Sequence, residues 1–158
     1  MLRRSLIALA ILVMLPAAAS AGSFNYYGPQ LGFSQGPDQF VVGGHLKWNS
    51  VAPQLDFVPG VDMGFGGDQT LVALSGDFHY RIKSGARWQP YLGGGVGMQF
   101  NSGNNNSNNS SDTQTGGHFI VGAGVPTQGS SRFFTELKLG FGDSPDLKIM
   151  AGWNYRDR

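Results

Sequence analysis

The stretch Phe133-Phe134-Thr135-Glu136-Leu137-Lys138-Leu139-Gly140-Phe141 contains the clearest pattern in the sequence. One set of alternate positions, from Phe133 to Phe141, is mainly apolar, whereas the other set includes Glu136, Lys138 and Gly140. Successive side chains of a β-strand point to opposite faces, so this stretch predicts a strand with one apolar and one polar face.

Similar alternation recurs along most of the chain, in segments of about ten residues. The segments cover residues 26–34, 40–49, 54–65, 70–82, 88–100, 116–125, 132–142 and 147–156. Turn-forming residues separate them, no stretch after Gly22 has helical periodicity, and 25 glycines disfavour long helices. The chain is therefore predicted to be all-β, an eight-stranded antiparallel up-and-down barrel. Pro59 removes one ladder donor, so a bulge or a position near the rim is expected there.

The distribution of charge predicts which face points outward. In segments two to eight the apolar faces carry no charged residue, and the opposite faces carry four basic and four acidic residues. A soluble barrel would bury its apolar faces and expose its charges. Glycines on the charged faces instead suit a narrow interior, so the pattern predicts a transmembrane barrel with paired ions in its lumen. The predicted lumen network comprises Lys47, Asp56, Asp62, Asp77, His79, Arg81, Glu136, Lys138 and Lys148. Within it, Glu136, Lys138, Asp77, Arg81 and Lys148 are expected to form one bridging network that plugs the bore.

Aromatic residues gather at the ends of the predicted strands, as at a membrane interface. One predicted aromatic girdle comprises Trp48, Tyr80, Trp88, Phe133, Trp153 and Tyr155, and the opposite rim has Phe65, Phe100, Phe119 and Phe141. The girdle end carries Lys83, Arg87, Arg132, Arg156, Asp157 and Arg158, and the other end carries Asp38, Asp68, Asp112, Asp143 and Asp146. An even number of strands places both termini on one side, expected to be the periplasm, with the acidic loops outside the cell.

The first 21 residues are typical of a cleavable signal peptide. Arg3 and Arg4 precede an apolar run from Leu6 to Leu15, and Ala19-Ser20-Ala21 forms an A-x-A cleavage site. Residues 22–158 are then the barrel domain, in which 101–115 are expected to be a flexible, Asn/Ser-rich extracellular loop. Loss of the two arginines leaves about as many basic as acidic residues, so nucleic acid is not expected as a partner. The sequence contains no cysteine, which excludes disulfides and a lipid anchor on Cys.

The pair of segments Asp77-Phe78-His79-Tyr80-Arg81 and Trp88-Gln89-Pro90-Tyr91-Leu92-Gly93-Gly94-Gly95-Val96-Gly97 resembles small outer-membrane barrels of the OmpA-like and OmpX-like type, the opacity-type porin superfamily. The resemblance implies insertion into a Gram-negative outer membrane by the barrel-assembly machinery. Outer-membrane lipid and lipopolysaccharide are the expected partners, and the protein is expected to be a monomer. Such barrels usually end on an aromatic residue, whereas Arg156-Asp157-Arg158 follows Tyr155 here.

An enzyme is not expected, although a few barrels of this size modify lipid A. That chemistry requires a nucleophile beside a base, and no His-x-Ser-Asn run like that of the lipid A deacylases is present. His79 shares a face with Asp77 and Arg81. The pair of His79 and Asp77 resembles a catalytic dyad, but His79 is better interpreted as a member of the lumen network. His45 and His118 give weaker signals, and neither a metal site nor a cofactor is expected.

A structural or surface-interaction role in the cell envelope is therefore expected. Three alternatives remain open: a narrow porin-like channel for small solutes, a lipid-modifying enzyme and a soluble periplasmic barrel. A separate hypothesis assigns divalent cations, shared with lipopolysaccharide phosphates, to the acidic rim of Asp38, Asp68, Asp143 and Asp146.

Overall fold

A computed structural model describes residues 24–66, 69–102, 113–127 and 129–156. Within them the chain forms eight strands: β1 (Phe24–Gln35), β2 (Gln39–Ala52), β3 (Leu55–Gly66), β4 (Gln69–Arg81), β5 (Gln89–Ser102), β6 (Thr113–Pro126), β7 (Ser131–Gly142) and β8 (Leu147–Arg156). The predicted signal peptide lies outside the described residues, as does most of the Asn/Ser-rich loop. No helix in the described part of the chain is long and apolar enough to cross a membrane.

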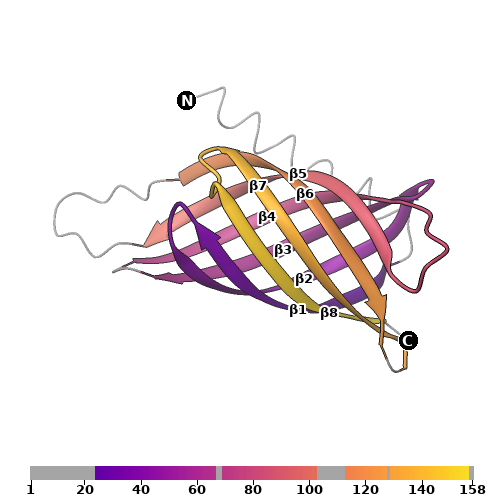
Figure 1. Ribbon diagram of the computed structural model, residues 1–158. Helices are drawn as coiled ribbons and strands as arrows, with labels where there is room; N and C mark the ends of the chain where they lie inside the picture. The colour runs from indigo at the N-terminus through magenta and orange to yellow at the C-terminus, as the bar shows by residue number, and fades with distance from the viewer. Residues whose placement is uncertain (1–23, 67–68, 103–112, 128, 157–158) are drawn as a thin grey trace, which may run out of the picture.

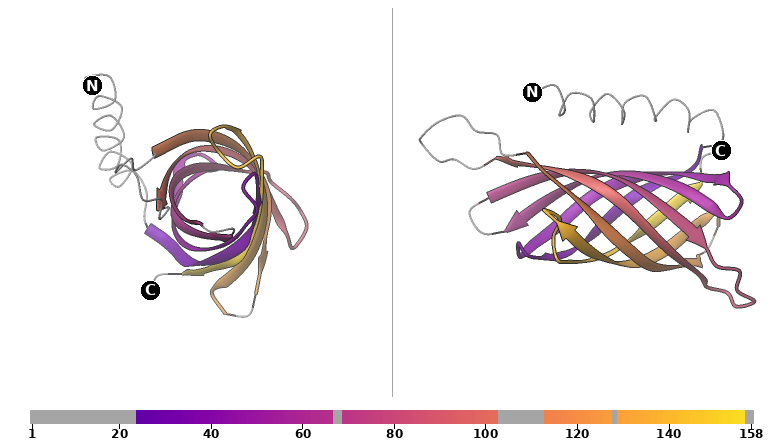
Figure 2. Two further views of the ribbon diagram at one scale, coloured as in Figure 1. Left: turned by 90° about the vertical axis from the view of Figure 1, so that its left-hand side faces the viewer. Right: turned by 90° about the horizontal axis from the view of Figure 1, so that it is seen from above.

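The eight strands form one closed antiparallel barrel in sequence order. Each strand pairs with the next one along the chain, and β8 pairs with β1, for example at Leu31↔Ala151. Figure 1 shows the strands inclined to the barrel axis, and the end-on view in Figure 2 shows them as a complete ring. Closure leaves no unpaired sheet edge, so each strand can pair its backbone N–H and C=O groups with a neighbour on both sides. The barrel is closed by this hydrogen bonding and needs no disulfide. The predicted eight-stranded barrel is confirmed.

The first strand follows the alternation more regularly than its sequence suggests. From Tyr27 to Ser34 its residues are alternately exposed and buried, with Gln30, Gly32 and Ser34 inward. Gly32 can lie inside because its missing side chain leaves room for the backbone carbonyl of Ile149 and the sulfur of Met150. Glycine thus marks a close approach between neighbouring strands rather than an interruption of the strand.

The strands are longer than predicted at the loop end of the barrel. Strand β5 continues to Ser102 and β6 begins at Thr113, so both extend into the range 101–115 that was predicted to be loop. Asn101 and Ser102 pair with β4, and Thr113 pairs with Phe100. Backbone hydrogen bonding to neighbouring strands extends β structure through these polar residues, whatever their local composition.

The expectation of a bulge or a rim position at Pro59 is wrong. Strand β3 keeps one register against β2, with His45↔Gly60 and Trp48↔Phe57 on either side of Pro59. On its other side Pro59 lies opposite Gly76 within an unbroken run of pairs with β4. The irregularity of this region lies between Trp48 and Ala52 instead, at the β2–β3 hairpin.

Candidate functional site

The polarity of the barrel is inverted relative to that of a soluble protein. Along β6, Phe119 is 65% exposed, the inward Ile120 is 1% exposed and Val121 is 51% exposed. The same alternation holds on the other strands, where the large exposed side chains are aliphatic or aromatic and most of the buried ones are polar or charged. An apolar belt therefore surrounds a polar lumen. We use "apolar belt" below for the outward side chains of the eight strands.

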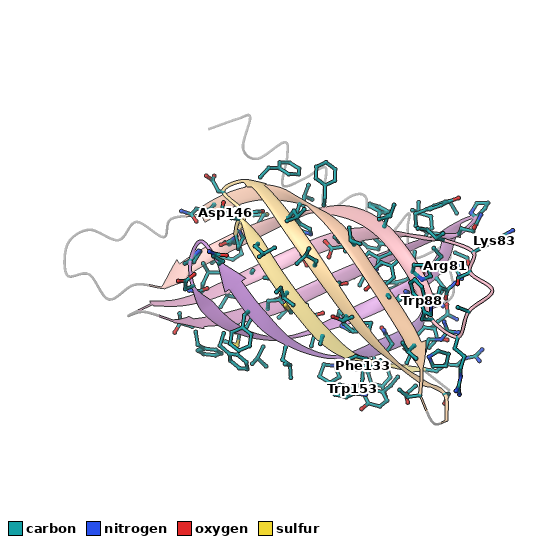
Figure 3. All side chains as sticks on the ribbon, in the orientation of Figure 1. Arg81, Lys83, Trp88, Phe133, Asp146 and Trp153 are labelled. Atoms are coloured by element: carbon teal, nitrogen blue, oxygen red, sulfur yellow. The ribbon has the colours of Figure 1, made fainter. Side chains whose placement is uncertain are left out.

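Aromatic rings mark both ends of the apolar belt. At one end the rings of Phe133 and Trp153 lie 5.1 Å apart, and Trp88 lies at the same end of the barrel in Figure 3. The other three members of the predicted girdle also lie near this end of their strands. Their register places them there, with the pairs Trp48↔Phe57, Tyr80↔Leu55 and Tyr155↔Ser131. At the other end Phe119 contacts Phe141 at 5.4 Å, and Phe33 contacts Phe40 at 5.3 Å.

The central cluster of the lumen is built around Asp77, on β4, and Lys138, on β7. Lys138 Nζ lies 2.5 Å from one oxygen of Asp77 and 3.3 Å from Glu136. The other oxygen of Asp77 lies 2.8 Å from Nε2 of His118, on β6. Tyr91, on β5, donates its hydroxyl to Glu136 at 2.8 Å. All five side chains are nearly inaccessible to solvent, so the cluster joins four strands across the bore.

A second cluster lies nearer the tryptophan end and is centred on Asp56, which is 0% exposed. Lys47 and Arg81 approach its two carboxylate oxygens at 3.1 Å and 3.2 Å. Ser50 donates its backbone N–H to Asp56 at 2.9 Å and accepts a hydrogen bond from Arg81 at 2.8 Å. Ser50 has a φ of 58°, so Asp56 stabilises a backbone conformation that serine seldom adopts.

A third cluster occupies the half of the lumen nearer the loops. Lys148, on β8, lies 2.8 Å from Asp62, on β3. Gln30, on β1, donates to the other oxygen of Asp62 at 2.6 Å. The carboxylate thereby connects β3 with β1 and β8, which lie on the far side of β2 in the closed ring.

The expectation of one continuous network needs correction. Lys138 contacts both Glu136 and Asp77, but Arg81 binds Asp56 and Lys148 binds Asp62 in separate clusters. The reason is geometric, since alternate residues of inclined strands enter the bore at successive heights. Only side chains at the same height meet, so the charges form layers. All eight lumen charges nevertheless take part in an ion pair.

Asp77 and His79, which resemble a dyad in the sequence, have different partners in the structure. The carboxylate of Asp77 contacts His118 and Lys138. His79 instead stacks on the ring of Tyr91 at 4.6 Å, and its Nε2 lies 4.0 Å from Glu136. Residues two apart on one strand face the same way but are separated along it, and the partner of each comes from another strand.

Sequence reasoning missed several members of these clusters. Tyr91, Gln30, Ser50 and Asn154 were not predicted as partners, although Asn154 contacts Nε2 of His45 at 2.8 Å. The alternation of residues 88–100 already placed Tyr91 on the polar face, so its inward direction was predictable. Its contact with Glu136 was not predictable, because the two residues are brought together only by the curvature of strands β5 and β7 around the bore.

The described part of the barrel holds two small cavities, one toward each end. The cavity nearer the tryptophan end has a volume of about 50 Å³ and is lined by residues that include His45, His79 and Arg132. The other has a volume of about 40 Å³ and is lined by residues that include Asp62, His118 and Lys148. Lys138 of the central cluster and Ser75 line both cavities, so these two side chains lie between them. Each has room for a few water molecules and is far smaller than an aqueous pore.

The histidines of the lumen contact other lumen side chains. Within the described ranges the histidines contact Asn154, Asp77 and Glu136, and none is hydrogen-bonded to a serine or threonine hydroxyl. No group of three His, Cys, Asp or Glu side chains among the described residues could hold a metal ion. The described aspartates of the acidic rim therefore give no support to the divalent-cation hypothesis; Asp68 and Asp112 lie outside the described residues.

Comparison with solved structures identifies the fold. The chain is similar to Neisserial surface protein A (NspA), with a TM-score of 0.65 and 11% identity over 85% of this chain and 96% of that one. It is equally similar to the N-terminal β-barrel domain of Pseudomonas aeruginosa OprF, with a TM-score of 0.65 and 13% identity over 86% and 99%. A de novo designed protein, TMB2.3, matches with a TM-score of 0.53 and 14% identity over 87% and 95%.

These matches confirm the predicted resemblance to small eight-stranded barrels at the level of the fold. No family model matches the sequence, and no curated protein matches it either. At identities of 11% to 14%, the likeness to the solved structures is one of fold.

Proposed function

We propose that this protein is an integral outer-membrane β-barrel with a structural or surface-interaction role, whose lumen is filled by ion-paired side chains. The observation that carries the proposal is the inverted polarity, with an apolar belt outside and all eight lumen charges paired inside. A monomer in water would not expose so continuous an apolar surface, which a bilayer covers. Strands of 10 to 14 residues are also long enough to cross the hydrocarbon core.

The proposal includes export, orientation and partners. Residues 1–21 act as the signal peptide, and the barrel-assembly machinery inserts residues 22–158 as a monomer. Both termini and the tryptophan end then lie in the periplasm, and the acidic loops face outward. The partners are outer-membrane lipid and lipopolysaccharide, and the role includes no catalysis.

Two measurements on the expressed protein test membrane insertion. We expect it in the detergent-extracted outer-membrane fraction, and we expect its unboiled form to migrate differently from its boiled form on an SDS gel. A closed barrel resists SDS until it is heated, because its backbone ladder has no edge at which unfolding begins. Recovery in the soluble periplasmic fraction without detergent would exclude the proposal.

A third measurement distinguishes the filled barrel from the alternative, a narrow porin-like channel for small solutes. The cavities bear on that alternative, since Lys138 of the central cluster lines both of them. Planar bilayers that contain the purified protein should show no stable conductance of porin size. A stable conductance of that size would contradict the filled lumen and leave the proposed membrane location intact.

A further inference from the structure

Three exposed basic side chains at the tryptophan end differ from the basic residues of the lumen. Lys83 and Arg87 lie in the β4–β5 turn, and Arg156 ends β8. Among the described residues, none of the three forms an ion pair with a carboxylate, whereas every lysine and arginine of the lumen clusters does. We name Lys83, Arg87 and Arg156 the basic arc.

Each residue of the basic arc directly follows or precedes an outward apolar side chain. Ile82 precedes Lys83, Trp88 follows Arg87, and Tyr155 precedes Arg156. Those three apolar neighbours are 38%, 50% and 44% exposed. If Ile82, Trp88 and Tyr155 lie at the border of the hydrocarbon, the adjacent charges lie at the depth of the lipid headgroups. Figure 3 shows Lys83 beyond Trp88 at this end of the barrel.

The basic arc extends around about half of the ring of strands. It runs from the end of β4 to the end of β8, while the β2–β3 hairpin at the same end, residues 49–54, carries no charge. Arg132 also lies at this end, but its guanidinium donates to Gln89 at 3.1 Å and lines the cavity at the mouth of the lumen. No acidic side chain among the described residues lies outside the lumen at this end. Cations at headgroup depth attract anionic lipids.

We propose that the basic arc binds the phosphates of anionic phospholipids in the leaflet that meets the tryptophan end. This inference rests on the proposed membrane insertion and goes beyond it by naming a lipid class and the side chains that select it. The position of the charges beside the apolar belt favours a lipid headgroup over the acidic groups of the cell wall, which lie farther from the membrane.

The test uses the full mature protein reconstituted into phosphatidylcholine vesicles that contain trace spin-labelled lipid. Electron paramagnetic resonance separates lipid held at the protein surface from free lipid. At low salt, spin-labelled phosphatidylglycerol should associate about three- to fivefold more strongly than spin-labelled phosphatidylcholine, and 0.5 M NaCl should reduce the preference. The triple variant Lys83→Gln/Arg87→Gln/Arg156→Gln should lose most of it.

The control triple variant, Asp38→Asn/Asp143→Asn/Asp146→Asn, changes three charges at the opposite end and should keep the preference. The double variant Lys83→Gln/Arg87→Gln alters only the β4–β5 turn, outside every strand, and should lose part of the preference without loss of folding.

Four outcomes would overturn the inference. Equal association of both lipids with the wild type, or an unchanged preference in the triple and double variants, would exclude lipid selection by the basic arc and leave membrane insertion intact. Binding of the wild type but not the triple variant to purified peptidoglycan, with equal association of both lipids, would assign the basic arc to the cell wall. Absence of any protein-held lipid, whatever its headgroup, would contradict the proposed function itself.

Discussion

The carboxylate of Asp77 illustrates how single residues stabilise this barrel. It is 2% exposed and lies between the ammonium of Lys138 and the imidazole of His118. A buried ion requires partners on both oxygens, because desolvation without compensation costs several kcal/mol. Asp77 contacts Lys138 and His118, from β7 and β6, so the same contacts that compensate its charge connect distant parts of the ring.

The position of Lys138 predicts which lysine of the lumen matters most for stability. Lys138→Met leaves Asp77 and Glu136 buried without their shared cation and should lower the free energy of unfolding by about 3–5 kcal/mol. This free energy is measured by denaturant titration in lipid vesicles, with tryptophan fluorescence as the signal of unfolding.

Lys47→Met is the matched control, since it makes the same substitution where Arg81 still pairs with Asp56. Its cost should be clearly smaller, about 1–2 kcal/mol. Equal costs for the two variants would show that the number of remaining partners does not decide stability in this lumen.

At the scale of the strand, β5 shows why one face of an element has glycine at three successive positions, Gly93, Gly95 and Gly97. A Cβ on the inward Gly95 would meet Oδ1 of Asp77, and would lie 2.7 Å from the carbonyl of Gly76 and 2.9 Å from Nε2 of His118. On the outward Gly94 the nearest atom would be the carbonyl oxygen of His118 at 3.4 Å. Gly95 thus makes room for the contact between Asp77 and His118, which neighbouring strands contribute.

Alanine substitutions at the two adjacent glycines test that interpretation. Gly95→Ala should destabilise the barrel by about 1–3 kcal/mol, because it displaces the contact between Asp77 and His118. Gly94→Ala adds the same methyl group one residue away, toward the outside, and should have little effect on the unfolding midpoint. A Gly94→Ala variant as unstable as Gly95→Ala would refute the assignment of the two faces.

The outward face of β6 gives a second prediction for an element. Val121 pairs with Leu137, which lies halfway between Phe133 and Phe141, and so belongs to the middle of the apolar belt. Val121→Arg should cost about 2–4 kcal/mol in a bilayer, since a charge there enters the hydrocarbon.

The matched control is Val125→Arg, because Val125 pairs with Phe133 in the aromatic girdle. At that depth the same charge should cost about 0–1 kcal/mol. Unfolding titrations of both variants in vesicles give the two values, and equal, negligible costs would indicate a surface that faces water.

For the whole molecule, the distribution of charge between its two ends predicts an orientation that labelling can measure. The chain has no cysteine, so a single introduced thiol reports one site. Gly85 lies in the β4–β5 turn with nothing within 4 Å of an added Cβ, and Asp38 is exposed in the β1–β2 turn at the other end. A membrane-impermeant maleimide on intact cells should label Asp38→Cys and should leave Gly85→Cys unlabelled until the outer membrane is permeabilised. The reverse result would invert the proposed orientation.

The sequence by itself determined the strand number, the strand faces and the inward position of the charges. The two-residue period of a strand places alternate side chains on opposite faces wherever the strand lies. Turn-forming residues separate the strands, and the charges and glycines on one face assign that face to the narrow interior. Phe133–Phe141 shows that period in nine residues, and β1 obeyed it despite Gly28, Pro29 and Gly32.

Only the tertiary structure decided which charges meet. The period of a strand fixes the direction of a side chain but not its height in the bore, which follows from strand inclination and register around the closed ring. For that reason Asp77 contacts His118 and Lys138 rather than His79, and one expected network becomes three layers. Register also decided how Pro59 fits without a bulge and how far β5 and β6 extend, since both depend on backbone pairing with neighbouring strands.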